Sequence, residues 1–83
     1  METIIIEIVL GSTGDVEEFM LPAHVPLASL LQDIALLIEQ MNPQVAFDRK
    51  ALILYDTERQ ALLQPAWTLA QNGVRDGSRL MIL

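Results

Sequence analysis

Few residues in this sequence have the types and spacing that chemistry requires. The single histidine, His24, lies in a loop between two prolines, where an imidazole could act as a general base or bind a metal. Either role needs partners, and the chain has no cysteine and no second histidine. Ser12, Ser29 and Ser78 stand in turn or helix-surface contexts without a nucleophile-elbow pattern. We therefore expect no catalytic residue, no metal and no cofactor, and we interpret His24 as a loop residue.

Two further patterns could bind an ion. The run Gly11–Asp15 has the glycines and hydroxyls of a phosphate loop, but no lysine follows it, and the acidic groups of Asp15, Glu17 and Glu18 would repel phosphate. Glu7 could join Glu17 and Glu18 around a cation, although carboxylates scattered along a strand are more often simply solvated. We interpret the run as a hairpin turn and the carboxylates as strand surface.

Composition restricts the class of protein. The chain has 83 residues, which predicts a single domain over residues 1–83, and 52% of them are apolar, enough for a dense core. A net charge of -6 with only five scattered basic residues argues against nucleic acid as a partner. The start, residues 1–3, lacks the basic region of a signal peptide, and no apolar run is long enough to cross a membrane. We therefore expect a cytoplasmic domain.

The first third of the chain predicts a β-hairpin. Residues 4–10 are short and rich in β-branched side chains, and residues 16–21 form the return strand after a turn. If Glu7 faces water, Ile5 and Val9 share its face, and the other apolar residues of that strand face the core.

The next segment has the spacing of a helix. Pro26 suits a first helical turn, and Asn42–Pro43 ends the helix. Leu36 projects away from the main apolar stripe. That stripe consists of Leu27, Leu30, Leu31, Ile34, Leu37, Ile38 and Met41.

Three shorter strands are predicted after the helix. Residues 51–55 and 60–63 flank a polar turn, and residues 78–83 form an apolar strand after turns at Gly73 and Asp76–Gly77. The order is β-β-α-β-β-β, and one helix packed across a sheet makes an α+β fold.

Residues 68–83 resemble the end of ubiquitin-like β-grasp domains, most closely those of the YukD/EsaB family, the small proteins of Gram-positive type VII (WXG100) secretion systems. That family typically ends G-[IV]-x-[ND]-G-[DS]-x-L-x-[IL]-L, as residues 73–83 do here. It also has a strand ending in Leu-Pro, a further proline and an apolar helix, as in residues 19–31. The resemblance implies a mixed sheet whose last strand is central and parallel to the first.

Side chains alternate between the two faces along the third and fifth predicted strands, and both faces of these strands are apolar. Only one of the two groups of apolar side chains can pack beneath the helix. By resemblance to ubiquitin-like domains, the inward set is Ile53, Tyr55, Leu80 and Ile82. The outward set is then Leu52, Leu54, Met81 and Leu83. Together with Ile5 and Val9 it would form an apolar patch, which suggests a partner or self-association site unless loops cover it. Trp67 could be a core plug or an interface anchor, and we expect it to be partly buried. The predicted interaction patch is Ile5, Leu52, Leu54, Met81, Leu83, Arg79 and Trp67.

The resemblance implies a non-enzymatic accessory or regulatory protein that binds type VII secretion components, or itself, through the sheet face. In the family, the same domain also occurs at the cytosolic N-terminus of EccD-type membrane components, so this chain could be such a domain. Covalent modifiers and sulfur carriers of this fold need a Gly-Gly tail. The sequence stops at Leu83 within the last strand, so we expect no conjugation unless a tail was removed. A role in oligomerisation alone is a further alternative.

Overall fold

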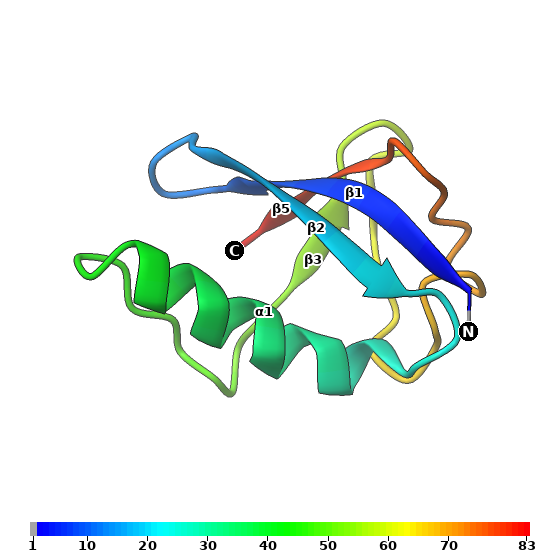
Figure 1. Cartoon of the computed structure of the whole chain (residues 1–83), viewed down its shortest axis with the longest axis horizontal. Coiled ribbons are helices and arrows are strands. Elements are labelled where there is room, and N and C mark those ends of the chain that lie inside the picture. Colours follow the sequence, from blue (N-terminus) through cyan, green and yellow to red (C-terminus); the bar gives the residue numbers. More distant parts are fainter. Residues whose placement is uncertain (1) are drawn as a thin grey trace.

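The computed structural model describes residues 2–83 as a five-stranded sheet crossed by one helix (Figure 1). The elements in chain order are β1 (Thr3–Leu10), β2 (Val16–Pro22), α1 (Leu27–Met41), β3 (Leu54–Asp56), β4 (Ala61–Leu62) and β5 (Arg79–Ile82). The strand order is β2-β1-β5-β3-β4. β5 is parallel to β1, and the other neighbours are antiparallel, which confirms the predicted element order and the central last strand.

The hairpin of β1 and β2 follows its sequence pattern. Alternation buries one face of β1 beneath α1 and leaves Ile5, Glu7 and Val9 on the other face. On β2, Phe19 is opposite Ile6 and faces the core. The buried residues of β1 are Ile4, Ile6, Ile8 and Leu10, as predicted.

The helix begins and ends as predicted. The backbone N–H of Leu27 donates to the Trp67 carbonyl at 2.8 Å, and that of Ala28 donates to the Pro65 carbonyl at 2.9 Å. These bonds satisfy first-turn N–H groups that a helix cannot satisfy itself. At the other end, the Asn42 side chain donates to the Ile38 carbonyl.

Two residues of the predicted helix stripe lie outside the core. Leu37 is 46% exposed and Met41 is 54% exposed, so their predicted burial is wrong. Leu37 lies about 100° around the helix axis from buried Ile38, and the narrow sheet does not cover that flank. Leu36 is exposed, as predicted.

The predicted inward set is confirmed on β5, where Leu80 and Ile82 are buried, but the register of β3 contradicts it for Ile53 and Tyr55. Leu54 faces the core opposite Ile82 and is 1% exposed, whereas Tyr55 lies on the outer face opposite Met81. The outward orientation predicted for Leu54 is therefore wrong. Residues 51–55 are apolar at both parities, so the pattern alone could not decide the face. The neighbouring Asp56 decides it.

Asp56 faces inward because the turn after β3 needs its carboxylate. One oxygen, Oδ1, accepts the backbone N–H groups of Glu58 and Arg59 at 3.0 and 3.1 Å, and Oδ2 accepts Arg59 Nε at 2.9 Å. Burial raises the pKa of Asp56, but the hydrogen bonds from Arg59 and Glu58 and the Arg59 charge outweigh it. The net pKa lies below the usual aspartate value.

The last connection is held by turns and by Asn72. Gly73 and Gly77 have φ of 78° and 85°, as the sequence predicted for closing turns. The guanidinium of Arg59 packs on Gly73 and donates to the Asn72 carbonyl. The buried Asn72 side chain accepts from the Gln64 N–H at 2.8 Å and donates to the carbonyls of Gln64 and Thr68. This network ties the β4 end of the sheet to the loop before β5.

Candidate protein-docking surface

The face of the sheet opposite α1 carries a row of apolar side chains. The register places one residue of each strand in line across the whole sheet. Each of the five is exposed or half-buried. The row consists, in strand order, of Val16, Val9, Met81, Tyr55 and Leu62.

Two more apolar residues extend this row toward the end of the sheet. The Leu83 N–H donates to the Ile53 carbonyl at 3.0 Å, so the two residues are neighbours. Their exposures are 55% and 39%. A Cβ on Gly11 would lie 2.6 Å from Leu83 Cδ2, so the glycine lets Leu83 lie against the end of β1. We call the whole set the outer apolar surface: Val9, Val16, Ile53, Tyr55, Leu62, Met81 and Leu83.

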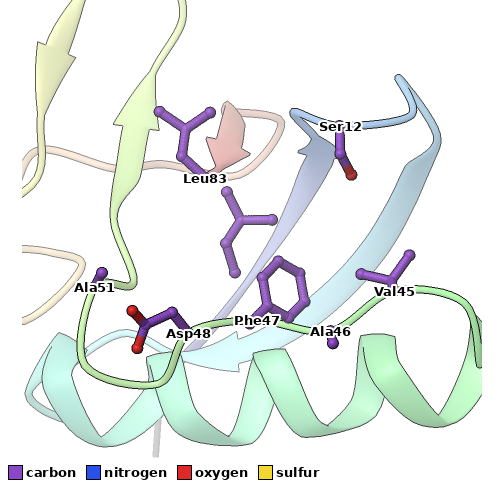
Figure 2. A pocket seen from close by; sticks show the side chains of 8 residues that line it. Ser12, Val45, Ala46, Phe47, Asp48, Ala51 and Leu83 are labelled. Atoms are coloured by element: carbon purple, nitrogen blue, oxygen red, sulfur yellow. The ribbon is translucent and has the colours of Figure 1, made fainter.

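Recesses adjoin this surface at two places. Figure 2 shows the first, a pocket of about 260 Å³ whose wall includes Leu83 and Phe47. Its lining is completed by Ser12, Val45, Ala46, Asp48, Ala51 and Ile82. The second, also about 260 Å³, is lined by Ile53 and Leu62 together with Leu31 of the helix. Apolar recesses beside exposed apolar side chains can receive the anchor residues of a protein partner.

The predicted interaction patch is only partly brought together. Met81 and Leu83 belong to the outer apolar surface, whereas Leu54 is in the core and Leu52 is half-buried against it. Ile5 is exposed on the same face, but the row that contains Arg79 separates it from Met81. The members therefore do not form one contiguous patch.

Trp67 lies in the loop after β4 and is 50% exposed, so it is partly buried, as expected, and is not a core plug. It lines a shallow pocket together with Leu62. Sequence reasoning missed Leu62, because residues 61–63 are all apolar and show no alternation, and it placed Ile53 and Tyr55 on the wrong face.

A charged row crosses the outer face next to the apolar one. Glu7 is paired with Glu18 on β2 and with Arg79 on β5. Arg79 forms an ion pair with Glu7 at 3.2 Å. Within residues 2–83, no cation lies within ion-pair distance of Glu18.

Charge is divided between the two halves of the sequence. All five lysines and arginines lie between residues 49 and 79, so the basic residues are confined to one part of the chain and are not scattered along it. Eight of the eleven acidic residues precede residue 49. The β2 side of the sheet is therefore acidic, and the β3 side carries the cations.

No reactive cluster accompanies these surfaces in the described residues. His24 is exposed and contacts Glu2 at 2.7 Å, away from the outer apolar surface. Residues 2–83 contain no group of three side chains suited to hold a metal ion. The one helix in this range is too short to span a membrane.

The sequence matches the family described as WXG100 protein secretion system (Wss), protein YukD, over residues 3–82. The chain belongs to the YukD family. This confirms the resemblance drawn from the closing turns and the last strand. A comparison with curated proteins found no match.

Several solved structures with the same fold are parts of type VII secretion systems, and others include a ubiquitin from Caldiarchaeum subterraneum. The ubiquitin-like domain of the Mycobacterium tuberculosis protein EccD1 has 22% identity and a TM-score of 0.80, with 100% of this chain and 99% of that chain covered. The EccD5 domain from Mycobacterium xenopi has 17% identity and a TM-score of 0.83, with 100% and 94% covered. In the ESX-5 inner membrane complex, a chain with 17% identity and a TM-score of 0.80 is matched over 21% of its length by 100% of this chain. These likenesses confirm the ubiquitin-like β-grasp fold.

Proposed function

We propose that this chain is a non-enzymatic accessory protein of a type VII secretion system that acts in the cytoplasm and docks another protein of the apparatus on the outer apolar surface. Membership of the YukD family supports the assignment to a type VII secretion system. The row of apolar residues across the solvent face supports the mode of action, because such positions normally carry polar side chains. This row is the observation on which the proposal rests.

The partner is an apolar segment of a secretion-apparatus protein. Its large side chains enter the two recesses beside Leu83 and Leu62, and the remaining contacts cover Met81 and Tyr55. Buried aromatic or aliphatic anchors of this kind carry most of the energy of protein interfaces. The contact is non-covalent and requires no reaction at the C-terminus.

The test is recovery of apparatus proteins from cells that express the tagged chain together with its secretion system. Leu62→Asp places a charge on a residue that is 59% exposed at a sheet edge. Leu36→Asp is the matched control, because Leu36 is exposed on the helix side. We expect Leu62→Asp to lose the apparatus proteins and Leu36→Asp to keep them. Equal recovery with both variants would contradict the proposal.

A second candidate is a domain of an EccD-type membrane component. The match with the EccD1 domain over the full chain favours it. The native protein distinguishes the two candidates by mass and location. A species of 9.3 kDa in the cytoplasmic fraction supports the accessory protein. A much larger membrane-bound species supports the EccD-type component, and a ladder of larger soluble conjugates would support a covalent modifier.

A further inference from the structure

We propose that the free edge of β2 binds an extended, basic segment of another protein, which adds a strand to the sheet. This site adjoins the outer apolar surface at Val16 but uses the backbone edge of β2 instead of the face of the sheet, so either proposal can fail without the other. Strand addition needs unpaired backbone groups and side chains that select the incoming segment. β2 provides both.

The backbone of β2 has unpaired groups at Glu18 and Met20. Their partners in β1 are Glu7 and Ile5. Ile5, however, receives the Gly77 N–H on its carbonyl at 2.8 Å and donates its own N–H to Asp76 Oδ1 at 2.8 Å. The Glu7 N–H donates to the Ser78 carbonyl at 3.0 Å.

Because hydrogen-bonded and non-bonded pairs alternate along an antiparallel ladder, the N–H and carbonyl groups of Glu18 and Met20 point away from β1. β2 is the terminal strand of the sheet formed by residues 2–83. These groups therefore form a row that another strand can pair with.

The side chains at this edge select a positively charged segment. Glu18 lies on the outer face beside Glu7, and Arg79 neutralises Glu7 alone. Glu17 lies on the opposite face of β2, and Asp15 precedes the strand. No lysine or arginine occurs before residue 49. A lysine or arginine of an added strand would lie directly across from Glu18 and relieve its repulsion from Glu7.

The helix provides apolar contact on the inner side of the same edge. Two helix residues hydrogen-bond the loop between α1 and β3. The Gln32 side chain donates to the Arg49 carbonyl, and the Glu39 carboxylate accepts the Phe47 N–H. That loop leads to the β3 side of the sheet, so the opposite flank of α1 faces the β2 side, where the sheet ends and leaves it uncovered. Leu37 occupies this flank, and Met41 follows one turn later. An incoming strand that alternates basic and apolar residues fits both faces.

A second copy of this chain does not fit the edge. Pairing of two β2 strands would bring Glu17 and Glu18 of one copy against the same residues of the other. Like charges directly opposite each other destabilise a strand pair, and charged edge residues commonly prevent such pairing. The occupant is therefore a basic segment of a different protein.

The probe is a short synthetic peptide in which valine alternates with lysine and arginine. Binding to the 83-residue chain is measured by fluorescence anisotropy, and amide hydrogen exchange is followed by NMR. We expect saturating peptide to slow exchange at Glu18 and Met20 by about tenfold or more, because their N–H groups gain partners. Two control peptides are used: one with glutamate in place of the basic residues and one with N-methylated valines. Neither should bind.

Protein variants separate the backbone contribution from the charge. Met20→Pro removes an N–H that the ladder does not use, and edge strands tolerate proline. It should weaken binding by about tenfold, whereas Met20→Ala should change it by less than about twofold. Glu18→Lys should weaken binding by about three- to tenfold, and the control Glu58→Lys should not.

Three results would overturn the proposal. The first is slowed exchange elsewhere on the molecule without a change at Glu18 and Met20. The second is equal binding of the N-methylated peptide to the wild-type protein, a result that does not depend on the folding of any variant. The third is a dimer in sedimentation experiments that Met20→Pro dissociates, since a second copy would then occupy the edge.

Discussion

The two halves of this molecule reach their structure by different means. Up to residue 48, long elements with regular patterns bury one face each and leave acidic groups on the other. After residue 48, the strands have only two to four residues and depend on side chains that bond the backbone, such as those of Asp56 and Asn72. Periodicity therefore describes the first half, and specific hydrogen bonds decide the second.

The largest effect is expected where the halves meet, at Leu54 in the core of the sheet. Leu54→Asp would remove buried apolar volume and bury a carboxylate, at a cost of roughly 4 kcal/mol or more in the free energy of unfolding. Most of the stability of a domain of this size would be lost. Ile53→Asp, on the exposed side, should cost less than about 1 kcal/mol. Urea denaturation measures both, and equal losses would contradict the observed register of β3.

The helix gives the next largest difference. Ile34 is almost fully buried, so Ile34→Ala should cost roughly 2–5 kcal/mol through lost burial and a cavity. Leu37→Ala should cost less than about 1 kcal/mol, because that side chain lies on the uncovered flank. Thermal and urea unfolding of the two variants test the division of the apolar stripe. A large loss of unfolding free energy for Leu37→Ala would mean that Leu37 is buried, as the sequence predicted.

In the second half, a single polar side chain should matter nearly as much as a core residue. Asn72→Ala would leave the Gln64 N–H and two carbonyls without their partners, which should cost roughly 1–3 kcal/mol. Gln71→Ala is the comparison and should cost less, since exposed Gln71 makes one such bond, accepting the Thr68 N–H at 2.9 Å. Hydrogen exchange at Gln64 gives a local readout. Unchanged stability of Asn72→Ala would show that water replaces these bonds.

The smallest effect is the pH dependence contributed by Asp56. Its pKa is lowered in the folded protein, so the unfolded chain takes up the proton first as the pH falls. The stabilisation is thus present above the usual value of 3.8 and is lost as the pH falls through the lowered value. Unfolding measured from about pH 6 down to pH 2 should show a shallower loss for Asp56→Asn than for wild type. The exposed Asp33→Asn variant should follow wild type.

The sequence predicted the structure of the first half of the chain better than that of the second half. The alternation in residues 4–10 and the limits of α1 were readable, because one face of each element is consistently apolar. The closing turns were readable from Gly73 and Gly77. The face of β3 was not, because Leu52, Ile53 and Leu54 are all apolar and the choice depends on bonds that Asp56 makes after folding. The apolar row across the outer face likewise exists only through the strand register.

The most direct test of the docking proposal is site-specific crosslinking in cells that contain the secretion apparatus. A photo-crosslinking amino acid is placed at the position of Leu62 in one experiment and of Leu36 in another, and the captured proteins are identified by mass spectrometry. The proposal predicts that a component of the type VII apparatus is captured from position 62 and not from position 36. Capture from position 36 alone, or of the same proteins from both positions, would contradict it.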